Sequence, residues 1–146
     1  MREFKGRVIL GGNIKGEALV SKRGFNALVA YQDLLFLGEK PGYYNDFNDK
    51  DIFGKPLAGS ILCAPQAIGS SANGEVIQAA AYQDMHPAAL LLANTADSLA
   101  ISGVLLADIW VNKPIVTVDE LGDEFLDYVK TGSKIEVFED GTVRVE

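Results

Sequence analysis

Short apolar runs alternate with stretches of helical spacing through the second half of the chain. Runs of four to six apolar residues bounded by Gly, Pro or polar residues are typical of buried strands, whereas apolar residues three and four apart indicate helices. The predicted strands lie at 60–64, 88–93 and 115–118, the predicted helices at 72–83, 98–110 and 119–130, and a predicted hairpin at 134–138 and 142–145. Alternating strands and helices predict a parallel sheet with right-handed crossovers.

The first half of the chain has a different pattern. The segments 6–10 and 16–20 predict β-structure, with a tight turn at Gly11-Gly12 between them. The spacing over 27–37 fits a strand and a helix equally well, and 39–55 is polar and predicts a long loop, which in a compact domain is often functional. We therefore expect one α/β domain over 1–146, with a partly parallel sheet and a β-rich N-terminal layer.

Composition narrows the chemistry. The 146 residues include 13 Lys and Arg against 20 Asp and Glu, a net charge of −7, which argues against nucleic acid as a partner. No apolar stretch is long enough to cross a membrane, and no leader is recognisable, so we expect a cytoplasmic protein. The single Cys63 excludes an internal disulfide and a Cys-based zinc or iron–sulfur site within this chain. The single His86 leaves little for a His-based metal site or a Ser-His-Asp triad. Catalysis would have to come from hydroxyls, carboxylates or a partner chain.

The turn between the strand at 60–64 and the following helix contains the strongest candidates for catalytic residues. Ser70 and Ser71 follow Gly69 at the start of this helix, where free backbone N–H groups and the helix dipole favour an anion. The alternative is that a serine merely caps the helix, since Ser is a common N-cap. The spacing matches neither a Walker A loop nor a nucleophile elbow.

Six segments together resemble one known family over nearly the whole chain. They are 4–8 (FKGRV), 16–20 (GEALV), 53–59 (FGKPLAG), 65–71 (PQAIGSS), 87–93 (PAALLLA) and 112–116 (NKPIV). The chain resembles the small subunit of the aconitase X dehydratases. The resemblance implies a swivelling β/β/α domain that closes over a large subunit, and an iron or iron–sulfur centre on that large subunit, with no cofactor in this chain.

The resemblance also implies a reaction and a site. The family dehydrates small hydroxy acids, mevalonate 5-phosphate in one branch and hydroxyproline isomers in another. It uses the serine after the turn glycine as proton acceptor, which is Ser70 here. Gly69, Ser71 and Asn73 are then expected to bind substrate, although Asn73 could equally orient the turn or face solvent.

Two positions of the turn depart from the family pattern. Many members have Arg and Ser where this chain has Ile68 and Ala72. An Arg is a natural partner for a phosphate or carboxylate, so its loss leaves the substrate open. Two hypotheses follow: a catalytic small subunit, and a non-catalytic swivelling domain that serves as a binding or assembly module. On the first hypothesis we assign the base to Ser70, at the tip of the turn, and the helix cap to Ser71.

The other candidates have ordinary structural explanations. We expect His86 to cap or lie at the surface and Cys63 to be a small buried residue. The acidic residues of the 39–55 segment do not match a calcium-binding loop, and we expect a solvated acidic loop. Its aromatic residues could line a partner surface or pack back onto the domain. The residues in question are Asp46, Asp49 and Asp51, and Tyr43, Tyr44, Phe47 and Phe53.

Overall fold

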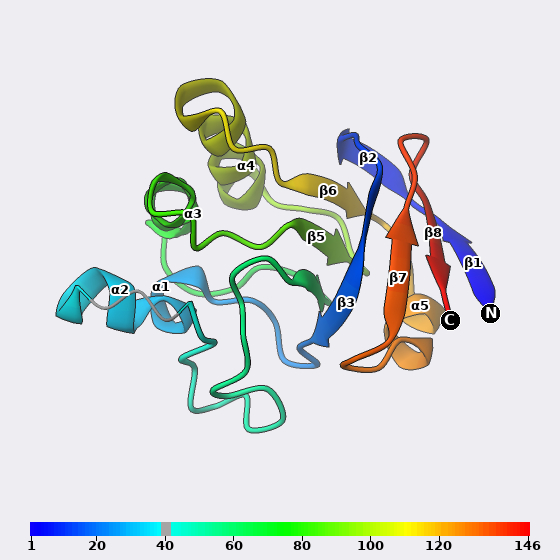
Figure 1. Cartoon of the computed structure of the whole chain (residues 1–146), viewed down its shortest axis with the longest axis horizontal. Helices are drawn as coiled ribbons and strands as arrows, with labels where there is room; N and C mark the ends of the chain where they lie inside the picture. The colour runs from blue at the N-terminus through cyan, green and yellow to red at the C-terminus, as the bar shows by residue number, and fades with distance from the viewer. Residues whose placement is uncertain (39–41) are drawn as a thin grey trace.

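The computed structural model describes residues 1–38 and 42–146, which form an eight-stranded sheet covered by helices (Figure 1). The strands are β1 (Arg2–Lys5), β2 (Arg7–Leu10), β3 (Ile14–Val20), β4 (Ile61–Ala64), β5 (Ala89–Leu92), β6 (Val116–Asp119), β7 (Lys134–Val137) and β8 (Thr142–Val145). The helices are α1 (Ala27–Ala30), α2 (Gln32–Leu37), α3 (Asn73–Tyr82), α4 (Ser98–Val111) and α5 (Asp123–Tyr128). The expected α/β class is confirmed.

The sheet is nearly closed into a barrel. Its strand order is β1-β8-β7-β3-β4-β5-β6-β2, so the first two strands of the chain lie at opposite ends of the order. Only Gly6 separates β1 from β2, which brings the two ends of the sheet together, and the Gly6 N–H donates to the Gly141 carbonyl at 3.1 Å. A Cβ at Gly6 would lie 2.5 Å from both the Asp119 carbonyl oxygen and the Val118 side chain, so this close approach requires glycine.

β4, β5 and β6 are buried along their whole length, which explains the apolar runs that predict them, whereas β3 is buried only over its last three residues. β3, β4, β5 and β6 are parallel neighbours, as predicted for the last three. Leu62 and Leu90 face one core, beneath α1, α3 and α4, whereas Cys63 and Leu91 face a second core inside the near-barrel. Cys63 is fully buried and is the small core residue that the sequence indicates.

Most of the predicted helices are confirmed, with one exception. α3 buries Val76, Ile77, Ala80 and Ala81, and α4 is capped by Asp97, whose carboxylate accepts from the Ala100 N–H at 2.7 Å. The helix predicted at 119–130 is wrong at its start, because Asp119 ends β6 and Gly122 has a positive φ of 90°. The observed α5 is therefore short, and its Phe125 and Leu126 close the second core.

The N-terminal half differs from the expectations in two respects. β1 was not predicted, and the strands on either side of Gly11-Gly12 pair with β6, β7 and β4 rather than with each other. The ambiguous 27–37 segment forms α1 and α2. The segment from residue 42 to residue 58 is largely irregular, as predicted, and the first three residues of that prediction, 39–41, lie outside the described residues.

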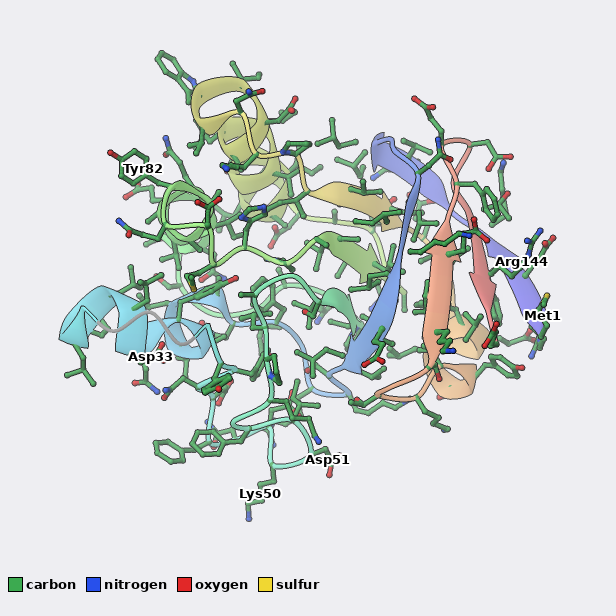
Figure 2. The ribbon with its side chains drawn as sticks, in the orientation of Figure 1. Met1, Asp33, Lys50, Asp51, Tyr82 and Arg144 are labelled. Atoms are coloured by element: carbon green, nitrogen blue, oxygen red, sulfur yellow. The ribbon has the colours of Figure 1, made fainter. Side chains whose placement is uncertain are left out.

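The acidic part of this irregular segment is not a solvated loop. Asp46 and Asp49 are 7% and 3% exposed, and only Asp51 is exposed as expected. The buried Ser21 hydroxyl donates to the Asp49 carboxylate, which ties the segment to the end of β3. Burial raises the pKa of Asp49, with Asp46 adding to the shift and the Ser21 bond opposing it. Figure 2 shows Lys50 and Asp51 pointing away from the fold at the tip of this segment.

Candidate active site

Loops from four parallel strands meet at one edge of the sheet. Because β3, β4, β5 and β6 run in the same direction, the residues that follow them share the carboxyl edge, where α/β sheets commonly bind ligands. Three backbone bonds of 2.9 Å join these loops: Phe25 N–H to the Gln66 carbonyl, Ile68 N–H to the Phe25 carbonyl, and Asn94 N–H to the Pro65 carbonyl. The turn that carries Ser70 is therefore held between the loops that follow β3 and β5.

Ser70 is tied to the start of α3 through its hydroxyl. The Ser70 Oγ accepts from the Ala72 N–H at 3.0 Å, and the Ser70 carbonyl accepts from the Asn73 N–H at 3.2 Å. The helix begins at Asn73 and has no side-chain cap, so the expected capping role of Ser71 is wrong. Gly69 has a positive φ, and in the turn that follows it the Ser70 hydroxyl, rather than the Ser71 hydroxyl, accepts a hydrogen bond from the backbone.

Hydrogen-bond donors gather around this turn. Among the residues that the structure describes, the backbone N–H groups of Gly69, Ser70 and Ser71 have no acceptor. An N–H group that donates to a hydroxyl oxygen favours negative charge on that oxygen. The turn can therefore stabilise a negatively charged oxygen, either on Ser70 or on a bound anion.

Asn26 covers the glycine of the turn. A Cβ at Gly69 would lie 2.3 Å from Asn26 Nδ2 and 2.5 Å from its Cγ, and Gly69 has φ 95°. Asn26 is the N-cap of α1, and its Oδ1 accepts from the Val29 N–H at 3.4 Å. Asn26 is not among the predicted site residues, because the spacing over 27–37 is ambiguous; an Asn directly before a helix is the signal that could have indicated it.

Asn73 fixes the turn from the other side. It is only 3% exposed, so the solvent-facing alternative is wrong. Its Nδ2 donates to the Ile68 carbonyl at 2.7 Å and its Oδ1 accepts from the Leu28 N–H at 3.2 Å. Both ends of its side-chain amide are thus engaged with backbone, which makes Asn73 a positioning residue rather than a free donor.

A charged pair lies further along the same edge. The Asp119 side chain is fully buried and accepts from Arg7 Nε at 2.9 Å, Arg7 Nη2 at 2.7 Å and the Ala96 N–H at 2.6 Å. Burial alone would raise the pKa of Asp119, but the Arg7 and Ala96 bonds and the Arg7 charge lower it below its ordinary value. This pair anchors β2 against β6 and leaves the Arg7 guanidinium half-exposed at the edge.

His86 and Cys63 do not join this site. The His86 carbonyl accepts from the Gly59 N–H ahead of β4, at the opposite edge of the sheet, and burial lowers the pKa of the His86 side chain. Burial raises the pKa of the Cys63 thiol, which disfavours the thiolate that binds metals. Within 1–38 and 42–146, no three His, Cys, Asp or Glu side chains gather into a group that could hold a metal ion. These residues do not fit an iron centre.

The turn that carries Ser70 is partly accessible, since Gly69 and Ser71 are exposed and Ser70 is half-buried. Surface cavities of 440, 420 and 450 Å³ lie elsewhere, and none of these three is lined by a described residue of the 69–73 turn. Close by in sequence, the segment ahead of β4 exposes Phe47 and Phe53, whose rings stack with centroids 4.6 Å apart. The two tyrosines of this segment differ in exposure: Tyr44 is buried in the core, and Tyr43 is 47% exposed.

A family model matches this architecture. The model of the aconitase X swivel domain covers residues 3–145. The chain belongs to the aconitase X swivel domain family. Two relatives, from Thermococcus kodakarensis and Aeropyrum pernix, are each named phosphomevalonate dehydratase small subunit and are 30% identical to this swivel domain. The matches cover 92% and 97% of this chain and 89% and 92% of the relatives.

Solved structures agree with the family. The crystal structure of Thermococcus kodakaraensis aconitase X in its holo form superposes with a TM-score of 0.82 at 29% identity, covering 100% of this swivel domain and 99% of the matched chain. The solution structure of a UPF0107 protein gives a TM-score of 0.80 at 26% identity, covering 99% of both chains. The expected swivelling fold is thereby confirmed. No helix of the described residues is long and apolar enough to span a membrane.

Proposed function

We propose that this chain is the small subunit of a cytoplasmic hydro-lyase that dehydrates a small hydroxy acid, with Ser70 as the proton acceptor. The observation that carries the proposal is the bond from the Ala72 N–H to the Ser70 Oγ at 3.0 Å. This bond favours negative charge on the oxygen that must take a proton, and Ser71 has no equivalent bond among the described residues. The names of the curated relatives support the reaction class.

The chemistry that this chain would supply is a proton transfer. Dehydration breaks a C–H bond next to a carboxylate and a C–O bond on the neighbouring carbon, and releases water overall. The proton would pass to the ionised Ser70 oxygen, which the Ala72 N–H stabilises, and the electron pair of the C–H bond would form the double bond as hydroxide leaves. The Ser70 hydroxyl would then release its proton, so that proton and hydroxide together make up the water. Because the described residues do not fit an iron centre, we place that centre on the large subunit and assign no step to it here.

A large subunit is the partner that the site requires. Gly69 and Ser71 are exposed and Ser70 is half-buried, whereas closing an active site expels water and strengthens the electrostatic interactions inside it. Phe47 and Phe53 are 68% and 42% exposed, and Phe36 and Leu37 of α2 are 71% and 69% exposed. A cavity of 270 Å³ lined by Phe36, Leu37 and Phe47 joins the two groups. Exposed aromatic residues of this kind suit a protein interface.

The substrate is expected among small hydroxy acids, and the relatives' names put mevalonate 5-phosphate first. Ile68 stands where many family members have an Arg, and its apolar side chain offers no positive charge to a phosphate. It packs against Gly24, where a Cβ would lie 3.0 Å from the Ile68 side chain. Hydroxyproline isomers therefore belong in the same panel as the phosphorylated acid.

The test is reconstitution with the large subunit from the same organism. The co-purified complex is assayed for dehydration of mevalonate 5-phosphate, hydroxyproline isomers and other hydroxy acids, and each subunit alone is the control. Hydrogen exchange is measured on this chain with and without the large subunit. We expect turnover by the complex only, and slower exchange at 69–73 and 42–55. A complex that forms but leaves exchange at 69–73 unchanged and dehydrates nothing would favour the non-catalytic assembly module.

A further inference from the structure

Asn26 places an unused hydrogen-bond donor against the turn that carries Ser70. We infer that Asn26 Nδ2 binds the carboxylate of the hydroxy acid and stabilises the charge that builds on it as Ser70 removes the proton. The inference rests on the proposed function and adds a specificity-determining residue to it.

The orientation of the Asn26 amide follows from its cap. Asn26 has extended backbone angles, φ −97° and ψ 96°, and its Oδ1 accepts from the Val29 N–H at 3.4 Å. The oxygen is committed to α1, so the Nδ2 carries the donors that remain. The Nδ2, Cγ and Oδ1 atoms lie 2.3, 2.5 and 2.8 Å from the position that a Cβ on Gly69 would take, so the whole amide lies against the turn. The neighbouring Phe25 is hydrogen-bonded to Gln66 and Ile68, so the backbone leading to Asn26 is fixed against the turn.

The donor itself is free and accessible. Among the described residues nothing accepts a hydrogen bond from Asn26 Nδ2, and the side chain is partly exposed. Of the Asn26 atoms, Nδ2 lies nearest to the position that a Cβ on Gly69 would take, at 2.3 Å. Asn73, in contrast, is buried, with its Nδ2 bonded to the Ile68 carbonyl and its Oδ1 bonded to the Leu28 N–H. Asn26 is therefore the side-chain amide at this turn that can still donate to a ligand.

The chemistry gives this donor a place in the reaction. The carbon that loses its proton to Ser70 is bonded to the carboxylate, so a group beside Ser70 is suitably placed for the carboxylate. Charge moves onto that carboxylate as the C–H bond breaks, and a fixed N–H donor stabilises the transition state more than the bound substrate. Loss of the donor should therefore lower kcat more than it raises KM.

Asn26→Asp separates this role from a structural one. Asp caps a helix as well as Asn and has almost the same shape, so α1 and the contact with Gly69 are retained while the donor becomes a negative charge. We expect the melting temperature to be unchanged and kcat of the reconstituted complex to fall on the order of 100-fold. Asn26→Ser keeps a cap, adds no charge and should lose on the order of 10-fold.

The pH profile provides a readout that a structural role would not move. The carboxyl group that Asn26→Asp introduces can donate a hydrogen bond again once it is protonated, so the activity of this variant relative to wild type should rise as the pH falls from 8 to 5. Asn13→Asp is the matched control, because Asn13 is an exposed Asn whose Oδ1 accepts from Glu139 N–H at the far hairpin. An Asn26→Asp complex with wild-type kcat and pH profile overturns the inference.

Binding of a carboxylate by Asn26 can also be measured without dehydration activity. If the wild-type complex dehydrates no hydroxy acid, the proposed function fails, and Asn26 is then judged by titrating the ¹⁵N-labelled chain with sodium acetate. A saturable shift of the Asn26 Nδ2 resonances, larger than that of the Asn13 amide, supports carboxylate binding at Asn26. Identical, non-saturable drift of both amides overturns it.

Discussion

Gly69→Ala tests how tightly Asn26 and the serine turn are packed. Gly69 has φ 95°, and the new Cβ would lie 2.3 Å from Asn26 Nδ2, closer than any stable contact. Holding a residue with a side chain in the left-handed region costs about 1–2 kcal/mol. Asn26 must also move away, which weakens its cap on α1 at a cost of about 1 kcal/mol. We expect a total loss of about 2–3 kcal/mol in the free energy of unfolding.

Two comparisons isolate the Asn26 contact. Gly59 also has a positive φ, 75°, but nothing lies within 4 Å of its Cβ position, so Gly59→Ala should show the backbone strain alone. In an Asn26→Gly background the clash at Gly69 disappears, and Gly is nearly as good a cap as Asn. Gly69→Ala should then cost only about 1–2 kcal/mol, which leaves a coupling of about 1 kcal/mol between the two sites.

Urea unfolding at pH 7 measures these differences, and thermal unfolding gives a second estimate. For a chain of this size each kcal/mol corresponds to about 2–4 °C, so Gly69→Ala should lower the melting temperature by about 5–10 °C. An equal cost of Gly69→Ala in the wild-type and Asn26→Gly backgrounds would refute the packing of Asn26 against the turn.

Two further predictions concern buried carboxylates. Asp119→Asn should lower stability by about 1–2 kcal/mol at pH 7, a discounted value because Arg7 is half-exposed. Since the pKa of Asp119 is lowered in the folded chain, this contribution is present above the ordinary Asp pKa, so urea unfolding should show the gap to wild type narrowing below about pH 4. Burial instead raises the pKa of Asp49, so the folded chain holds that proton more tightly than the unfolded chain does. Stability of the wild type relative to Asp49→Asn should therefore fall as the pH rises from about 4 through the folded pKa, and a pH-independent difference would contradict this explanation.

The parallel half of the fold was predictable because its strands are buried on both faces. Such strands are continuous apolar runs, and β4, β5 and β6 lie where those runs are. β1 carries no comparable signal, because Arg2, Glu3 and Lys5 are exposed at the edge of the sheet. The late start of α5 depends on Asp119, a charged residue that enters a strand only because Arg7, 112 positions away, pairs with it.

At the candidate site, too, only the part that is continuous in sequence could be predicted. Ser70 could be found from local spacing and from the family resemblance, because the turn is continuous in sequence. The surroundings of the turn could not, since Asn26 and Leu28 meet Gly69 and Asn73 only through the packing of α1 against α3. The error over Ser71 has a local cause: the spacing does not reveal that the Ser70 hydroxyl turns back to the Ala72 N–H.

A matched pair of serine variants shows whether Ser70 takes the proton. The reconstituted complex is prepared with Ser70→Ala and with Ser71→Ala, and dehydration is measured alongside the melting temperature of each small subunit. Ser70→Ala should abolish turnover and cost only about 1 kcal/mol of stability, the worth of one hydrogen bond to Ala72. Ser71→Ala, at an exposed position without a cap bond, should retain turnover and change stability by less than about 0.5 kcal/mol. Turnover that survives Ser70→Ala and is lost with Ser71→Ala would show that Ser70 is not the proton acceptor.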